Sequence, residues 1–143
     1  MKEGFRFHSH TSDVTIECWG RTLKQAFEVA ALATFEVMVN TSKVRPVEPI
    51  TVQVEGIDLE ELLLAWIGRL IALVDINRQF YSKFEVEDIS EGPEGFKLTG
   101  KALGETIDLE RHETRTGVKA MTYADMKIEQ SAAKTTVWFT LDI

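Results

Sequence analysis

The chain has 143 residues, 44% of them hydrophobic, which is enough to bury the core of one domain. Its 16 Lys and Arg stand against 23 Asp and Glu, and the formal net charge of -7 disfavours a function that depends on neutralising nucleic-acid phosphates. The single cysteine, Cys18, excludes an internal disulfide framework and the multi-cysteine zinc sites, and it favours a reducing, cytoplasmic location.

The first two segments of the chain alternate between apolar and polar residues. Phe5 and Phe7 alternate in the first segment, and Val14 and Ile16 alternate in the second. This period of two is typical of half-buried strands. We therefore expect a hairpin that turns through residues 11–13.

Two long helices are predicted further along the chain. The first, from Leu23 to about Val39, follows "TLKQ", a capping box in which Thr22 and Gln25 satisfy free amides at a helix start. The second follows Asp58 and runs to about Asp75. It contains the most hydrophobic run, residues 62–74, which is too short for a membrane span and includes Arg69. Its expected buried stripe is Leu59, Leu62, Leu63, Trp66, Ile67, Leu70 and Val74.

The remaining segments have mostly the pattern of strands. They are residues 49–56, a hairpin at 80–89 and 96–103, a helical turn at 108–113, at least one strand within 117–130, and a last strand at 135–143. This order predicts one α+β domain over residues 1–143, with two long helices packed on a mainly antiparallel β-sheet. An inserted β-hairpin subdomain around residues 80–105 is compatible with the same pattern.

Histidines and a carboxylate mark the first turn. His8 and His10 would share one face of a strand and could both approach a metal ion, but zinc needs three or four ligands. The other candidates of suitable type are Cys18, which is expected in a different strand, and His112, which is about a hundred residues away. Asp13 has two interpretations, a turn residue that satisfies backbone amides or a ligand.

Hard oxygen ligands gather at the last two positions. Asp142 contributes a carboxylate, and Ile143 contributes a carbonyl or carboxylate oxygen. If these oxygens meet Asp13, the site would contain oxygen ligands only, which suits calcium or magnesium better than zinc.

A basic segment lies just before the last predicted strands, those within residues 117–143. It contains Arg111, His112, Arg115 and, expected on a strand, Lys119. These side chains could be solvated, or could contact phosphate, carboxylate or a partner protein. The chain has no phosphate-binding glycine loop and no nucleophile elbow. It therefore looks more like an acidic accessory protein than an enzyme.

Three motifs together resemble the archease family. They are "HTSDVTIECWGRTLKQAFEVAALATFEVM", "ERHETRTGVKAMTY" and the final "FTLDI", and they occur in the family's order over nearly the whole chain. Gly117 and Ala124 depart from the residues that are common in the family.

The resemblance implies a non-catalytic accessory protein. Such a protein activates an RtcB-type tRNA-splicing RNA ligase by promoting its GTP-dependent guanylylation and multiple turnover, and it meets RNA only through that ligase. The resemblance also implies a divalent ion, usually calcium, bound by Asp13, Asp142 and Ile143. It assigns activation of the partner to Asp13 and Lys119, and we expect His10, Arg111 and His112 to support them.

Two other classes of function stay open at this point. A metal-dependent hydrolase would use His8, His10 and Asp13 around a water molecule. An RNA-binding or chaperone module would use Arg111 and Lys119, together with Arg115.

Overall fold

The computed structural model describes residues 3–143. Within them the chain forms two α-helices, one short 3-10 helix and seven strands. Their bounds are β1 Gly4–Ser9, β2 Asp13–Gly20, α1 Leu23–Met38, η1 Thr41–Lys43, β3 Glu48–Gly56, α2 Leu59–Asn77, β4 Gln79–Gly92, β5 Gly95–Thr106, β6 Ala120–Gln130 and β7 Thr135–Asp142. The predicted α+β class is confirmed.

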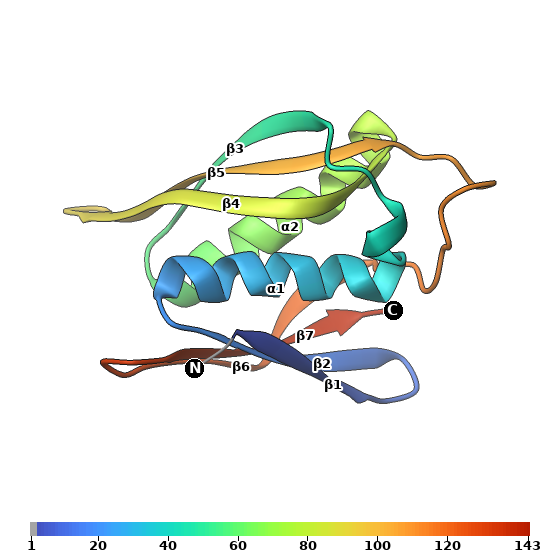
Figure 1. The fold of residues 1–143 in the computed structure, drawn as a ribbon. Coiled ribbons are helices and arrows are strands. Elements are labelled where there is room, and N and C mark those ends of the chain that lie inside the picture. Colours follow the sequence, from blue (N-terminus) through green and yellow to red (C-terminus); the bar gives the residue numbers. More distant parts are fainter. Residues whose placement is uncertain (1–2) are drawn as a thin grey trace.

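The elements form three layers, with both helices in the middle one (Figure 1). A three-stranded sheet of order β3-β5-β4 covers one side of the helices, and a four-stranded sheet of order β1-β2-β7-β6 covers the other. All strand pairs are antiparallel. The sequence pattern predicts an antiparallel sheet correctly, but it does not reveal that the strands divide into two sheets.

Each helix begins at the residue that the sequence predicts. The Thr22 hydroxyl accepts a hydrogen bond from the Gln25 amide at 3.1 Å, and the Gln25 side chain accepts one from the Arg21 amide at 2.6 Å. The Asp58 carboxylate accepts one from the Glu61 amide at 2.8 Å. These contacts satisfy N–H groups that the first helical turns leave without an intrahelical partner.

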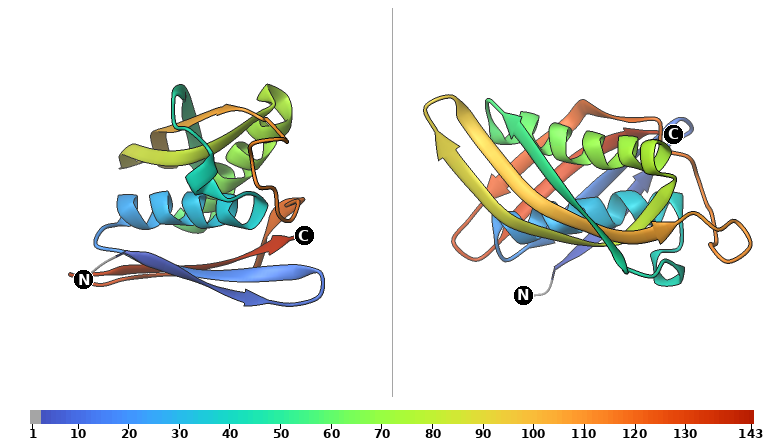
Figure 2. Two further views of the ribbon diagram at one scale, coloured as in Figure 1. Left: turned by 45° about the vertical axis from the view of Figure 1, so that its right-hand side comes forward. Right: turned by 90° about the horizontal axis from the view of Figure 1, so that it is seen from above.

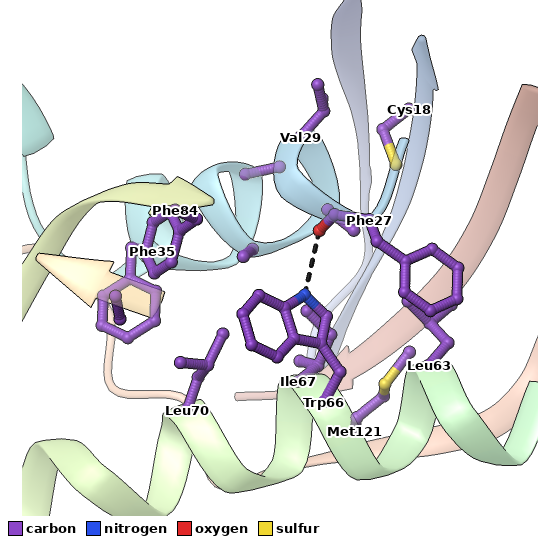
Figure 3. Packing of buried hydrophobic residues seen from close by; sticks show 14 of the residues in the cluster. Cys18, Phe27, Val29, Phe35, Leu63, Trp66, Ile67, Leu70, Phe84 and Met121 are labelled. Carbon is purple, nitrogen blue, oxygen red and sulfur yellow. Dashed lines mark hydrogen bonds between the residues drawn. The ribbon is translucent and has the colours of Figure 1, made fainter. Parts of the chain in front are cut away.

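The apolar faces of the two helices meet in the core (Figure 3). Trp66 is fully buried there, and its indole N–H donates a hydrogen bond of 3.0 Å to the main-chain carbonyl of Phe27. The bond connects α2 to α1 directly. It also gives the one polar atom of this large side chain a partner, as burial requires.

The hairpin predicted within residues 80–105 is present as β4 and β5. It shares its sheet with β3, and it packs on both helices, so it forms one face of the molecule (Figure 2). Two register shifts bend β4, between Tyr81 and Lys83 and between Val86 and Asp88. Such bulges increase the local twist and let a long strand curve over the helices.

Strand β6 is interrupted by a wide bulge. Thr122 pairs with Thr140 and the next paired residue is Lys127, opposite Trp138. Within the bulge Asp125 has a φ of 57°, in the left-handed region that Asp tolerates better than most residues.

Neither helix in the described part of the chain is long and apolar enough to span a membrane.

Candidate functional site

Strands β2 and β7 bring the two predicted carboxylates together. Asp13 and Asp142 are paired directly in the antiparallel register. Residues opposed in this way project from the same face of the sheet, with Cβ atoms about 5 Å apart. The neighbouring pair, Val14 and Leu141, points to the opposite face and is buried in the core. The two acids therefore lie on the outer face of the four-stranded sheet.

Main-chain hydrogen bonds hold the end of β7 beside the first turn. The Ile143 amide donates to the Ser12 carbonyl at 3.1 Å, and the His10 amide donates to the Asp13 carbonyl at 2.9 Å. The oxygens of Ile143 are thereby kept near the turn that carries Asp13. The structure brings together the three residues that the resemblance implies as ion ligands.

The carboxylate of Asp13 contains an unusual oxygen. Oδ1 is buried and, among the described residues, accepts no hydrogen bond. A carboxylate oxygen removed from water without a partner is costly, so such an atom is expected to meet an ion or an ordered water. The oxygen ligands present are the kind that calcium prefers.

The same surroundings contain few other ligands. Among residues 3–143, no group of three His, Cys, Asp or Glu side chains is placed to hold a metal ion. An ion at Asp13 and Asp142 would therefore depend on main-chain and water oxygens for the rest of its coordination. Calcium accepts such ligands readily, whereas a structural zinc site does not.

Lys119 is connected to the same place through its main chain. Its amide donates a hydrogen bond of 2.8 Å to the carbonyl of Asp142, and its side chain is exposed. The residue lies immediately before β6, so the expectation that it belongs to a strand is off by one position. Its side chain lines a hollow together with residues of α2, among them Gly68 and Asp75, so Lys119 is connected to Asp142 through its main chain only.

The histidines of the first turn do not join Asp13. His8 is exposed, and its Nε2 lies 3.4 Å from a carboxylate oxygen of Glu17. His10 is also exposed. Because His8 pairs with Thr15 in the register, it lies two positions along the sheet from Asp13. This placement gives no support to a hydrolytic centre of His8, His10 and Asp13.

Arg111 and His112 belong to a different cluster. Arg111 donates two hydrogen bonds to the Glu105 carboxylate, at 2.7 and 2.8 Å, and His112 Nε2 lies 2.9 Å from the same group. His112 Nδ1 accepts from the Asp108 amide at 3.0 Å, so Nε2 carries the proton and donates to Glu105. Both residues stabilise the turn at 108–113, and the structure gives no support to the role beside Asp13 that we expected of them.

Glu105 was not singled out by the sequence. Its side chain is only 9% exposed, and hydrogen bonds from Arg111 hold the pKa of the carboxyl far below its usual range despite burial. The amide of Arg45 and the ring of His112 act in the same direction. No local pattern marks this residue, because its partners lie in two separate loops.

The proposed RNA-binding set is largely occupied by carboxylates. Arg111 binds Glu105, and Arg115 binds Glu36 at 3.1 Å. A guanidinium that is already paired with a carboxylate is less available to a phosphate. Since the chain also carries a net charge of -7, direct RNA binding through these residues is disfavoured.

Comparison with known proteins gives a consistent result. Residues 5–143 match the model of the Archease protein family (MTH1598/TM1083). The protein archease of Sulfurisphaera tokodaii is 48% identical over 139 residues, 97% of this chain and 98% of the relative. That of Aeropyrum pernix is 43% identical over 140 residues, covering 98% and 97%.

Two solved structures are also similar. The solution structure of Methanobacterium thermoautotrophicum protein 1598 has a TM-score of 0.83 and 38% identity, and the match covers 98% of this chain and 99% of that one. A Thermotoga maritima crystal structure described as an archease and possible chaperone has a TM-score of 0.57 and 17% identity, covering 94% and 93%. The second likeness supports the fold alone.

Proposed function

Because this chain belongs to the archease family, we propose that it is a non-catalytic accessory protein that activates an RtcB-type tRNA-splicing RNA ligase in the cytoplasm. The proposal includes a divalent ion, calcium in the first instance, bound by Asp13, Asp142 and an oxygen of Ile143. RNA would be contacted by the ligase and not by this chain.

One observation carries the proposal: Asp13, directly opposite Asp142, has a buried oxygen to which no group among residues 3–143 donates a hydrogen bond. Two carboxylates on one face repel each other unless a cation lies between them. An ion held there would supply positive charge for phosphate groups at the ligase's guanylylation centre. The residues of this chain would hold and orient it at the surface, since Asp13 and Asp142 are fixed by the ladder between β2 and β7.

Lys119 would act next to the two acids. Its amide is tied to Asp142, so its exposed side chain begins at a fixed point beside the site. We assign it the binding of an anionic group on the ligase or its guanylate, since an ammonium is a common phosphate ligand. In this scheme Asp13 and Asp142 carry the cation, and Lys119 aligns the partner.

A multiple-turnover assay with purified ligase, GTP and cleaved RNA tests the proposal. Asp13→Ala and Lys119→Ala should each reduce stimulation by about tenfold or more, as removal of a charge-assisted contact does. Glu110→Ala, an exposed carboxylate elsewhere, should stimulate like the wild type. If folded Asp13→Ala and Lys119→Ala proteins stimulate normally, the site assignment is wrong; if the wild type does not stimulate the ligase, the function is wrong.

A further inference from the structure

A groove with acidic walls lies at the other end of the molecule. It runs between the turn from β3 to α2 and the tip of the β4–β5 hairpin, and it has a volume of about 590 Å³. Figures 1 and 2 place this hairpin tip opposite the end that carries the C-terminus. Its lining includes Glu55, Glu61, Glu91 and Glu94, and we call it the acidic groove.

Close backbone packing fixes the walls of the acidic groove. Gly95 has a φ of 125°, and a Cβ there would collide with the carbonyl of Gly56. The two walls therefore touch at a point where side chains do not fit. On the helical side, Glu61 accepts a hydrogen bond of 3.0 Å from the Ile57 amide. A groove with such walls is preformed, so a ligand would spend little binding free energy on ordering it.

Apolar groups are accessible within this acidic surface. Ile57 is 71% exposed and lines the groove together with Phe96, which is half-buried. Tyr123, on β6, is also 54% exposed. The pKa of Tyr123 is raised by partial desolvation and by the negative charges of Glu61 and Asp58. Large exposed apolar groups next to one another are typical of contact surfaces.

The charge of the acidic groove is poorly neutralised by the chain itself. Of its charged residues, four are Glu and one is Lys97, which gives a net charge of -3. Lys97 approaches Glu55 at 3.7 Å, and both side chains are more than 70% exposed. Ion pairs of this kind contribute little. The remaining like charges repel one another, and a cationic ligand would relieve that repulsion.

We propose that the acidic groove is a docking site for a basic segment of another protein. The segment would place one large apolar side chain against Ile57 and Phe96 and would present Lys or Arg to the surrounding glutamates. Anionic lipids and nucleic acids would be repelled by the same carboxylates. A bound metal ion fits less well, because no three acidic side chains among residues 3–143 are placed to coordinate one. This site is separate from Asp13 and independent of the function proposed above.

A fluorescein-labelled peptide of sequence Lys-Arg-Leu-Lys-Arg-Leu, followed by fluorescence anisotropy, tests the docking site. We expect saturable binding to the full chain that weakens about tenfold or more in the double variant Glu91→Lys and Glu94→Lys. A control double variant, Asp88→Lys and Glu110→Lys, makes the same change in net charge outside the groove. It should weaken binding less than about threefold, which is the effect of long-range charge alone.

A second variant tests the apolar part of the site. Ile57→Ser leaves the charge unchanged at an exposed position, and it should weaken peptide binding by about fivefold because a partly buried apolar contact is lost. Equal weakening by both charge variants would overturn the proposal, as would no effect of Ile57→Ser. The proposal would also be overturned if the peptide does not bind. It would be overturned as well if the groove binds calcium in a way that replacing Glu91 and Glu94 abolishes, or if the chain self-associates through the groove.

Discussion

Asp13 and Asp142 face each other across β2 and β7, and Oδ1 of Asp13 accepts no hydrogen bond within residues 3–143. Two opposed carboxylates destabilise the sheet when no cation is bound and stabilise it when one is. If the pair binds calcium, as proposed above, the ion should stabilise the fold.

The first prediction concerns this dependence. Adding calcium to about a hundred times its Kd should raise the free energy of unfolding of the wild type by about 2.7 kcal/mol. Asp13→Asn should remove that gain, and in EDTA it should be at least as stable as the wild type because a repulsion is gone. Thermal unfolding in EDTA and in calcium measures both, with Glu110→Gln as control. An equal calcium response in Asp13→Asn and wild type would contradict the site.

The second prediction concerns Glu105. Replacing it with Gln breaks a part-buried, charge-assisted pair with Arg111 and should cost about 2 kcal/mol at pH 7. Because the folded pKa is depressed, this stabilisation is fully present above the unfolded pKa of about 4.3 and is lost as the pH falls toward the folded value. The difference in the free energy of unfolding between the wild type and Glu105→Gln should thus narrow by about 1.4 kcal/mol per pH unit below about 4.3.

Urea denaturation at pH 7, 4 and 3 measures this gap. Glu110→Gln, at an exposed position, should differ from the wild type by less than about 0.5 kcal/mol throughout. A gap that stays constant down to pH 3 would mean that Glu105 does not act through its charge.

The third prediction concerns the contact between the helices. Trp66→Phe removes the hydrogen bond to the Phe27 carbonyl and leaves a small void, and we expect a loss of about 2 kcal/mol. Trp138→Phe, on the outer face of the four-stranded sheet, should cost less than about 1 kcal/mol. Chemical denaturation of the two variants makes the comparison, and similar losses would count against the role of Trp66.

The fourth prediction uses two glycines. A Cβ at Gly68, inside α2, would meet no atom within 4 Å, so Gly68→Ala should stabilise the chain by about 0.5 to 1 kcal/mol through helix propensity. At Gly104 a Cβ would collide with the carbonyl of Phe80, so Gly104→Ala should destabilise it by about 2 kcal/mol or more. Calorimetry should show a higher Tm for Gly68→Ala and a lower Tm for Gly104→Ala. A change of the same sign in both variants would contradict the packing described.

The helices were the most predictable part of the fold. Thr22 and Asp58 mark their starts because short polar side chains satisfy free amides locally, and spacing of 3.6 residues marks the buried face. These signals lie within a few residues of sequence. The structure places Leu62, Trp66 and Leu70 in the core as that spacing predicts.

Strand partners were less predictable. The alternation of Val137, Phe139 and Leu141 identifies a strand, but the same alternation does not say that β2 lies beside it or that the strands form two sheets. The resemblance of three motifs, and not their spacing, suggested that Asp13 meets Asp142. Glu105 escaped notice because its burial depends on Arg45 and Arg111, which reach it from separate loops.

The two sheets differ in how far apart in sequence their strands lie. The β3-β5-β4 sheet is built from one stretch between residues 48 and 106, whereas the β2 to β7 ladder joins Thr15 to Thr140, 125 positions away. Closing so long a loop is entropically expensive and slow, so contacts of high contact order form late. During synthesis on a ribosome, Asp13 can therefore pair with Asp142 only after β7 has been synthesised. A nascent chain whose β7 has not yet been synthesised therefore lacks the acidic pair.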